Sequence, residues 1–407
     1  MSGSTRTPLR ILMVAPTPFF ADRGCHVRIL GEIQGLQSLG HEVVICTYPL
    51  GRDVPGVRTA RTWPVPWYRK LSAGPSIHKY YIDLLLTGLV RRWIRRWQPD
   101  VIHAHLHEGV CIGAAALGRR RIPLVLDYQG SLIEEVVAHQ FTKTGAPQHR
   151  VLHTIERWAD HRADAIITST AAAVTKLSEE FQVPQDRLHI VTDGVDVEQF
   201  QPRRNGTDIR KRFGVPDGRP LIVYTGLLNR YQGIDLLLES LSRVKQTGRP
   251  FHALLAGYPN EERYRAMAKT LGIADEVTLP GRLPFDLMPE LLAASDIAVS
   301  AKLPSSEGNV KLYTYLSAGL PTVAFDTPMN REILGEAGVL VPLVNPAAFA
   351  EGLSFLLDQR ARWEGLSRQA RERAVSQFSW RSVAQRIEQV YAQVRSPRSR
   401  TQPQEHI

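Results

Sequence analysis

The sequence lacks any apolar run long enough to cross a bilayer, because nowhere do about 18 uncharged apolar residues follow one another. Its first residues, MSGSTRTPLR, also lack the apolar stretch of a secretion signal. Cysteine is scarce: Cys25, Cys46 and Cys111 are odd in number and show no Cys-x-x-Cys spacing. We therefore expect a cytoplasmic protein without a disulfide framework or a zinc site, in which the cysteines are packing residues.

Glycine-rich dinucleotide motifs are missing too. No Gly-x-Gly-x-x-Gly follows the apolar segments 10–16 or 221–226, which disfavours a dehydrogenase. No internal repeat or low-complexity block is evident, so the sequence does not indicate a repeat architecture.

The length and apolar content of the chain are sufficient for two domains. With 407 residues, 43% of them hydrophobic and 22% charged, it can bury two ordinary cores. Its net charge of +10 is uneven, because residues 1–100 hold 14 Lys or Arg against 6 Asp or Glu. This excess indicates an anionic partner for the N-terminal half, either a membrane surface or a phosphorylated acceptor. Nucleic acid is the poorest choice, since no recognition motif accompanies the charge.

Apolar strand-like segments alternate with amphipathic helical ones along almost the whole chain, the pattern of a parallel sheet covered on both faces. We therefore predict an α/β fold with two Rossmann-like domains, residues 1–200 and 201–378. A helix over 379–395 is expected to return to the first domain, and residues 396–407 form a disordered tail. The predicted strands are 10–16, 42–48, 100–105, 123–128, 165–170 and 188–193 in the first domain, and 221–226, 251–257, 276–281, 297–301, 321–326 and 338–342 in the second.

The strand-to-helix loops are the candidate binding segments, since ligands of open parallel sheets bind beyond the carboxyl ends of the strands. The most informative is Ser305–Pro321, SSEGNVKLYTYLSAGLP, where a polar loop leads directly into a helix. Free backbone N–H groups and a positive helix end suit an anionic ligand. Glu307, Asn309 and Lys311 stand two apart there, and we expect them to face a sugar hydroxyl and a phosphate together. This layout indicates a nucleotide-sugar site.

Short motifs in a fixed order give the chain a family resemblance. They include GHEV at 40–43, PDVIHAH at 99–105, DGVD at 193–196, GIDLL at 233–237, ASD at 294–296, AGLPTV at 318–323 and FSW at 378–380. Over about residues 10 to 390 the chain resembles the family-4 glycosyltransferases. The resemblance implies the GT-B fold, with two parallel sheets facing across a cleft. It also implies a hexosyltransferase of EC class 2.4, which moves a sugar from a nucleotide diphosphate in the second domain to an acceptor in the first, with retention of anomeric configuration.

The donor apparatus of that family is present only in part. Its first glutamate is matched by Glu307, but the second falls on Thr314, and its usual Arg and Lys fall on Leu227 and Gln232. A leaving diphosphate needs compensating positive charge. Two cations at neighbouring positions are expected to supply it, namely Arg230 and Lys311. No Asp-x-Asp motif is present, and this design requires neither a metal nor a cofactor.

The remaining candidate residues follow from the same resemblance. Close approach to the donor is expected at Gly24 and Gly226, and backbone contacts at Gly308, Asn309 and Val310. Side chains of Gln232 and Thr314 are further donor contacts. Acceptor-side candidates are Asp22, Arg23 and Gln129, the last in place of a histidine that the family often has. His103 and His105 alternate on a strand, and we expect a core role for them rather than metal ligation.

Several alternatives stay open. The segment LVRRWIRRWQ at 89–98, with Trp63, Trp67, Arg69 and Lys70, is either a basic aromatic surface for anionic lipid or an ordinary sheet-covering helix. The acceptor is a glycan, a lipid or a small molecule, so the protein is expected in the cytoplasm or peripherally at the inner face of the membrane. Two other functions fit the fold: a catalytically inactive nucleotide- or glycan-binding protein of polysaccharide assembly, and a nucleotide-sugar epimerase.

Overall fold

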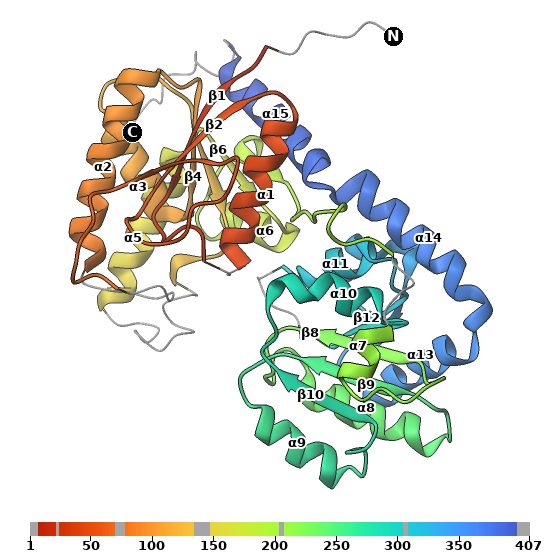
Figure 1. The fold of residues 1–407 in the computed structure, drawn as a ribbon. Coiled ribbons are helices and arrows are strands. Elements are labelled where there is room, and N and C mark those ends of the chain that lie inside the picture. Colours follow the sequence, from red (N-terminus) through yellow and green to blue (C-terminus); the bar gives the residue numbers. More distant parts are fainter. Residues whose placement is uncertain are drawn as a thin grey trace, which may run out of the picture. The chain divides into compact units, whose positions relative to one another are not determined.

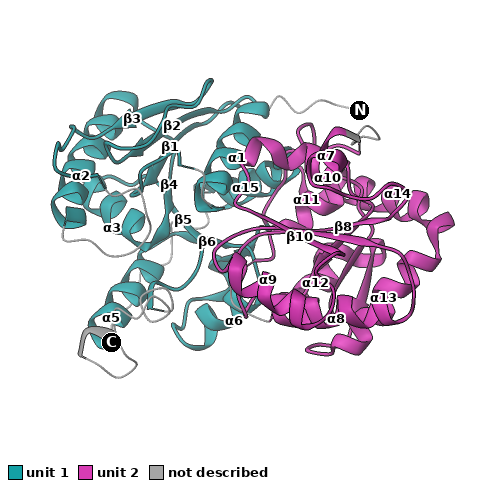
Figure 2. Cartoon of the chain, turned by 60° about the horizontal axis from the view of Figure 1, so that its bottom comes forward, with its two compact units in different colours: residues 1–192, 380–407 teal, residues 193–379 magenta. Residues whose placement is uncertain are grey.

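The computed structural model describes residues 7–21, 24–69, 78–133, 147–202, 207–303 and 308–396. The chain divides into two compact units (Figures 1 and 2). Unit 1 comprises Met1–Thr192 and Trp380–Ile407, and unit 2 comprises Asp193–Ser379. The predicted boundaries are residues 200 and 378, and the predicted tail lies outside the described residues apart from Ser396.

Unit 1 is built on a seven-stranded parallel sheet with the order β3-β2-β1-β4-β5-β6-β7. The six strands predicted for this domain are confirmed. β3 escaped prediction because its sequence, RTAR, has a single apolar residue. The strands are β1 (Arg10–Ala15), β2 (Glu42–Thr47), β3 (Arg58–Arg61), β4 (Val101–His105), β5 (Leu124–Tyr128), β6 (Ala165–Thr168) and β7 (Leu188–Ile190).

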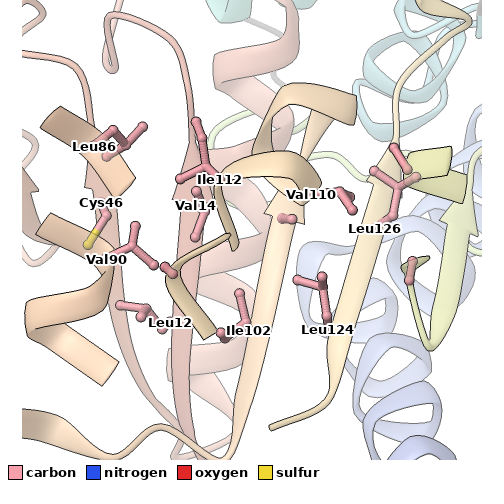
Figure 3. Close-up of a cluster of buried hydrophobic side chains, with 14 of the residues drawn as sticks. Leu12, Val14, Cys46, Leu86, Val90, Ile102, Val110, Ile112, Leu124 and Leu126 are labelled. Atoms are coloured by element: carbon pink, nitrogen blue, oxygen red, sulfur yellow. The ribbon is translucent and has the colours of Figure 1, made fainter. Parts of the chain in front are cut away.

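Successive side chains of a strand point to opposite faces, so each face of this sheet carries its own apolar core. Leu12 and Val14 of β1 belong to one core, part of which is drawn in Figure 3. Ile11 and Met13 belong to the other. The first core is covered by α2 (His78–Trp97), α3 (Leu106–Leu117), α5 (Pro147–Arg162) and α6 (Ala171–Glu179), and the second by α1 (Gly24–Ser38) and α15 (Trp380–Arg395).

The C-terminal helix α15 packs closely on α1 because two glycines of α1 face it. A Cβ on Gly31 would lie 1.9 Å from a ring carbon of Trp380. One on Gly35 would lie 2.3 Å from the Trp380 carbonyl oxygen. The last helix of the chain is therefore an integral layer of unit 1.

Unit 2 is built on a six-stranded parallel sheet with the order β10-β9-β8-β11-β12-β13. All six strands predicted for this domain are confirmed, and with them the α/β class of both units. They are β8 (Leu221–Thr225), β9 (His252–Ala256), β10 (Val277–Gly281), β11 (Ile297–Ser300), β12 (Thr322–Phe325) and β13 (Gly338–Val341).

The helices of unit 2 also form two layers. One core contains residues of α8 (Ile234–Gln246), α9 (Glu261–Thr270) and α13 (Pro346–Asp358). The other contains residues of α7 (Thr207–Arg212), α10 (Met288–Ala293), α11 (Lys311–Ser317), α12 (Pro328–Leu334) and α14 (Trp363–Arg373). Among the described helices of the whole chain, none combines the length and the apolar character that a membrane span needs.

Candidate active site

The loop between β8 and α8 of unit 2 is held in a fixed shape by glycine and by hydrogen bonds. It starts at Gly226, with φ +140°, and ends at Gly233, with φ +72°. A Cβ on Gly233 would lie 1.9 Å from the carbonyl oxygen of Ala301, so no other residue fits there. Tyr224 Oη donates to the Leu227 carbonyl at 2.8 Å, and Asn260 Nδ2 donates to the Leu228 carbonyl at 2.9 Å.

Lys311, the first residue of α11, reaches this loop. Its Nζ donates to Gln232 Oε1 at 2.5 Å and lies 5.2 Å from the centre of the Tyr224 ring. Burial lowers the pKa of Lys311 to about 7, and the neighbouring charge of Lys302 acts in the same direction. A nearby anion would stabilise the protonated form of this amine and raise its pKa again. Lys311 is therefore a candidate contact for an anionic ligand.

Lys302 is a second cation of this site, and our sequence analysis missed it. It lies two residues beyond Ser300, where β11 ends, and its side chain is almost buried. Its Nζ donates to the Gly308 carbonyl at 2.9 Å and lies 5.6 Å from the centre of the Tyr231 ring. The sequence did hold a signal for Lys302, namely a lysine just beyond the carboxyl end of a predicted parallel strand, where ligands of such sheets bind.

Asn309 differs from expectation, because its side chain points into the protein. It is 2% exposed, and its Nδ2 donates to Ser300 Oγ at 3.1 Å and to Asn330 Oδ1 at 3.0 Å. The side chain therefore ties Asn309 to the interior of unit 2 and does not face a ligand. Thr314 is also engaged, since its hydroxyl donates to the Lys311 carbonyl at 2.8 Å.

The other predicted donor residues have varied positions. Val310 is exposed, as is Gly226, beside which the Cε atom of Lys311 lies. Leu227, at the position where the resemblance leads us to expect an arginine, is also exposed. Arg230 is exposed on the β8–α8 loop. Gly24 is the first residue of α1 in unit 1, with open space where a Cβ would be. Three predicted residues lie outside the described residues: Glu307, Asp22 and Arg23.

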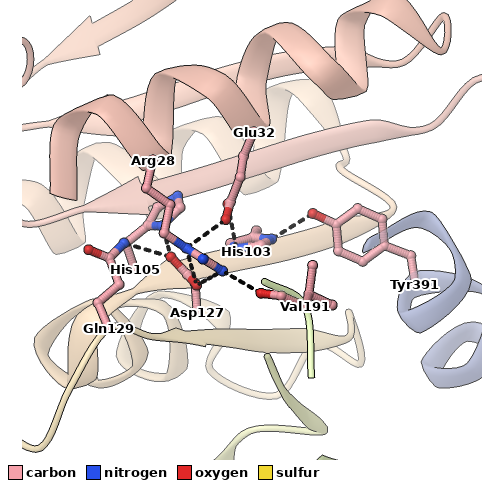
Figure 4. Close-up of polar contacts among 8 residues, drawn as sticks. All are labelled: Arg28, Glu32, His103, His105, Asp127, Gln129, Val191 and Tyr391. Carbon is pink, nitrogen blue, oxygen red and sulfur yellow. Dashed lines mark hydrogen bonds and ion pairs between the residues drawn. The ribbon is translucent and has the colours of Figure 1, made fainter. Parts of the chain in front are cut away.

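In unit 1, Gln129 follows β5 and is tied to a buried polar cluster (Figure 4). Asp127 accepts hydrogen bonds from Gln129 Nε2 at 2.6 Å, from His105 Nδ1 at 2.9 Å and from Arg28 Nε at 3.0 Å. Burial alone would raise the pKa of Asp127, but Arg28 and then the histidines override it and hold that pKa well below its usual range. An ionised Asp127 only accepts, so it fixes the Gln129 amide with its NH₂ group inward and its oxygen outward.

The cluster continues from Arg28 to the C-terminal helix. Arg28 Nε lies 3.0 Å from Glu32 Oε1, and Glu32 Oε2 lies 3.4 Å from His103 Nε2. His103 Nδ1 is 2.6 Å from the hydroxyl of Tyr391, on α15. Burial, followed by the charge of His105, lowers the pKa of His103 to about 3, so this histidine is neutral and shares one hydrogen bond with the Tyr391 hydroxyl. The two histidines of β4 thus serve the interior, as expected.

The tryptophans of unit 1 bear on the two readings left open for residues 89–98. Trp93 and Trp97 are partly buried against the core beneath α2, as expected of an ordinary sheet-covering helix. Trp63 and Trp67, by contrast, are 78% and 68% exposed. Lys70 lies outside the described residues.

Two family profiles match the chain. One is described as a glycosyl transferase 4-like domain and matches residues 23–194, and the other is described as glycosyl transferases group 1 and matches residues 219–359. Together they cover more than three quarters of the sequence.

Known proteins resemble the chain over almost its full length. The D-inositol 3-phosphate glycosyltransferase of Thermobispora bispora is 27% identical over 93% of this chain and 92% of its own. The sulfoquinovosyl transferase SQD2 of Arabidopsis thaliana is 25% identical over 94% of this chain and 73% of its own. The crystal structure of Anabaena HepE in complex with UDP matches with a TM-score of 0.72 at 16% identity, covering 95% of this chain and 100% of HepE, a likeness of fold.

The matched profiles, the two parallel sheets and the shared fold lead to one assignment. The chain belongs to the retaining glycosyltransferases of family 4, enzymes of EC class 2.4 with the GT-B fold that transfer a sugar from a nucleotide-sugar donor.

Proposed function

We propose that unit 2 binds the donor diphosphate through Lys311 and Lys302, in place of the Arg and Lys that the family usually carries on the β8–α8 loop. The observation that supports this is the 2.5 Å contact between Lys311 Nζ and Gln232 Oε1, because it brings an ammonium from α11 to the loop where Gln232 replaces a lysine. An ammonium has three N–H donors, so one bond to Gln232 leaves two for phosphate oxygens. Arg230 remains a candidate for a further contact from the same loop.

Glu307 is proposed to contact the donor sugar, and the backbone of Gly308, Asn309 and Val310 to hold it. The inward bonds of Asn309 support this role for the backbone, since they fix the segment next to the sugar position. Charge on the leaving diphosphate is balanced by the lysines, so the proposal involves no metal. UDP is the first nucleotide to test, because HepE was solved with it.

Gln129 is proposed to contact the acceptor. Its amide oxygen is turned away from Asp127 and accepts a hydrogen bond from an incoming hydroxyl. Asp22 and Arg23 remain proposed acceptor contacts from the loop after β1. Gly24 follows them at the start of α1.

We further propose that the acceptor is presented at an anionic membrane. Trp63, Trp67, Tyr80 and Leu84 are all more than two-thirds exposed. Trp67 Nε1 donates to the hydroxyl of Tyr81 at 2.9 Å, which joins the segment before α2 to the start of that helix. Farther along α2, four arginines are exposed: Arg91, Arg92, Arg95 and Arg96. Aromatic side chains beside a basic helix face are the composition of an interfacial membrane contact.

Thermal-shift measurements with UDP, GDP, ADP and TDP and their sugars test the donor site. A ligand that binds the folded state raises the melting temperature. We expect one nucleotide series to stabilise the wild-type protein, and Lys311→Met and Lys302→Met to reduce that shift. Lys269→Met, an exposed lysine of α9 in the same unit, is the matched control and keeps it. A full shift in both site variants contradicts the proposed role of the lysines, and no shift with any nucleotide favours a protein without transferase activity.

A further inference from the structure

Three side chains of the types that ligate metals converge between α3 and α5 of unit 1. His107 Nε2 lies 3.2 Å from Asp160 Oδ1 and 3.8 Å from Glu156 Oε1. One ligand atom from each residue lies within 4.8 Å of the other two. Glu156 and Asp160 are four residues apart on α5 and so share a face of that helix. All three side chains are buried.

Negative charge exceeds positive charge in this group. Two carboxylates face one histidine, which carries at most a single positive charge. Ser131 Oγ and the Ile133 N–H both donate to Glu156 Oε2 at 3.1 Å, but these donors are neutral. Glu156 Oε1 and Asp160 Oδ2 are buried and accept no hydrogen bond from any described residue. Buried carboxylate oxygens that accept no hydrogen bond are costly, so a proton or a cation would stabilise the group.

The polar cluster around Arg28 in unit 1 shows how buried carboxylates can be neutralised by a side chain. Glu32 and Asp127 of that cluster also lie beside histidines, but the guanidinium of Arg28 contacts both carboxylates. No arginine or lysine contact of this kind is found for His107, Glu156 or Asp160 in the described part of the chain. The nearby Glu108 adds negative charge and is itself paired with Lys79 at 3.1 Å.

We propose that His107, Glu156 and Asp160 form a structural site for one divalent transition-metal cation. One imidazole nitrogen and two carboxylate oxygens are a ligand set for zinc, manganese or cobalt. Ligand atoms around a tetrahedral zinc ion are about 3.4 Å apart, between the two distances measured here. The bonds of Ser131 and Ile133 to the other oxygen of Glu156 hold that carboxylate with Oε1 toward the cation.

The cation ties α3 and α5 to the segment Ser131–Ile133, which follows Gln129. Its role is to stabilise unit 1, and it takes no part in sugar transfer. The proposal depends only on residues of unit 1 and is independent of the proposed donor site.

A proton is the competing explanation for the charge balance, because burial raises the pKa of Glu156. The two explanations give opposite results for Glu156→Gln. If a cation completes the group, replacing the Glu156 carboxylate by an amide removes a charged ligand. The metal then no longer stabilises the protein. If a proton completes it, the amide imitates the protonated acid, and the variant is at least as stable as the wild type under all conditions.

The experiment uses the full chain, stripped with a chelator and then dialysed against Zn²⁺, Mn²⁺ or Mg²⁺. We expect one zinc or manganese per chain by elemental analysis and a melting temperature several degrees above that of the stripped protein. Glu156→Gln and Asp160→Asn are expected to lose both effects. His153→Gln is the matched control for binding outside the cluster, since that partly exposed histidine of α5 lies 4.0 Å from Glu180, and it keeps both effects.

Cobalt provides a readout that does not depend on the folding of a variant. Co²⁺ held by a nitrogen and two carboxylates in a low-symmetry site gives intense visible absorption in the wild-type protein, while octahedral Co²⁺ absorbs weakly. The proposal is overturned if the wild type retains no stoichiometric metal, if cobalt shows only the weak spectrum, or if Glu156→Gln raises the melting temperature of the stripped protein to that of the metal-treated wild type.

Discussion

The Lys311 ammonium and the Gln232 amide oxygen are 2.5 Å apart, so α11 delivers positive charge to the loop between β8 and α8. The family resemblance predicts two cations on that loop, at the positions of Leu227 and Gln232. Gln232 is nearly buried, and it holds the ammonium without adding a charge of its own. An ammonium from α11 therefore lies beside the loop of unit 2 where we propose that the donor diphosphate binds.

Replacing Lys311 by methionine is expected to weaken donor binding about 10- to 100-fold, because hydrogen bonds to a charged group contribute about 1.5–3 kcal/mol. Isothermal titration with the nucleotide sugar identified by thermal shift measures the effect. Gln232→Met should weaken binding less, since it removes only the residue that positions the ammonium. An equal loss in the two variants would contradict this order and would mean that donor binding depends on the amide as much as on the ammonium.

The pH dependence of binding and of stability should have opposite signs. Burial and Lys302 lower the pKa of Lys311 to about 7 in the folded protein, from an ordinary 10.5. Donor affinity therefore falls as the pH rises above about 7, because a neutral amine attracts phosphate weakly. Between about pH 7 and 10.5 the unfolded chain binds more protons at this site, so its contribution to the free energy of unfolding rises with pH.

Lys311→Met removes both trends. Titrations with nucleotide and urea denaturation from pH 6 to 9, on the wild type and this variant, measure them. If the wild type and the variant show the same pH slope, the titrating group is another one.

Strand prediction succeeded because buried parallel strands are short, nearly continuous apolar runs with turn residues at their ends. Segments such as Ile11–Ala15 and Leu221–Thr225 can hardly be interpreted otherwise. Arg58–Arg61 has no such run, and the pairing of β3 with β2 forms it instead. Sequence spacing thus predicts the interior of a sheet better than its edge.

The candidate site was harder to predict, because spacing does not show where a side chain points. Glu307, Asn309 and Lys311 alternate in the sequence, which suggested a shared direction. The turn into α11 instead sends Asn309 toward Ser300 and Lys311 toward Gln232. Lys302 follows a predicted strand, so its place at the strand end was predictable, but its contact with the Gly308 carbonyl arises only from the fold of the loop.

A methyl group at Gly35 should loosen α15 from α1. The Cβ would meet the Trp380 carbonyl oxygen at 2.3 Å, and backbone cannot rotate away as a side chain does. We expect Gly35→Ala to lower the free energy of unfolding by about 1–3 kcal/mol, measured by urea denaturation. Gly88→Ala on α2 is the matched control: its Cβ meets open space, so it should stabilise by up to about 1 kcal/mol. Equal effects at the two glycines would contradict the close packing of α15.

Arg28→Met should be among the most destabilising single changes in unit 1. It leaves the buried carboxylates of Glu32 and Asp127 without their cation, a loss that costs about 3–5 kcal/mol. Denaturant unfolding measures the cost. The control is Arg263→Met in unit 2, which breaks an exposed pair with Asp235 and should have a much smaller effect. A small effect at Arg28 would mean that protons replace the guanidinium at little cost.

The aromatic surface of unit 1 should decide membrane binding. Trp63 and Trp67 are expected to insert at the headgroup level while the arginines of α2 attract anionic lipid. Trp63→Ala combined with Trp67→Ala should weaken binding to phosphatidylglycerol-containing vesicles by at least about tenfold, since burying one such side chain contributes about 1.5–3 kcal/mol.

Co-sedimentation with vesicles, with and without anionic lipid, measures this binding. Phe355→Ala, which removes an exposed aromatic residue from unit 2, is the control and should leave binding unchanged. Replacing Arg92, Arg95 and Arg96 with glutamine should abolish the preference for anionic vesicles and reduce the dependence on salt, because screening acts on the charges and not on the aromatic contact. If the double tryptophan variant binds as well as the wild type, the surface around Trp63 and Trp67 is not the membrane contact, and the acceptor need not be presented at a bilayer.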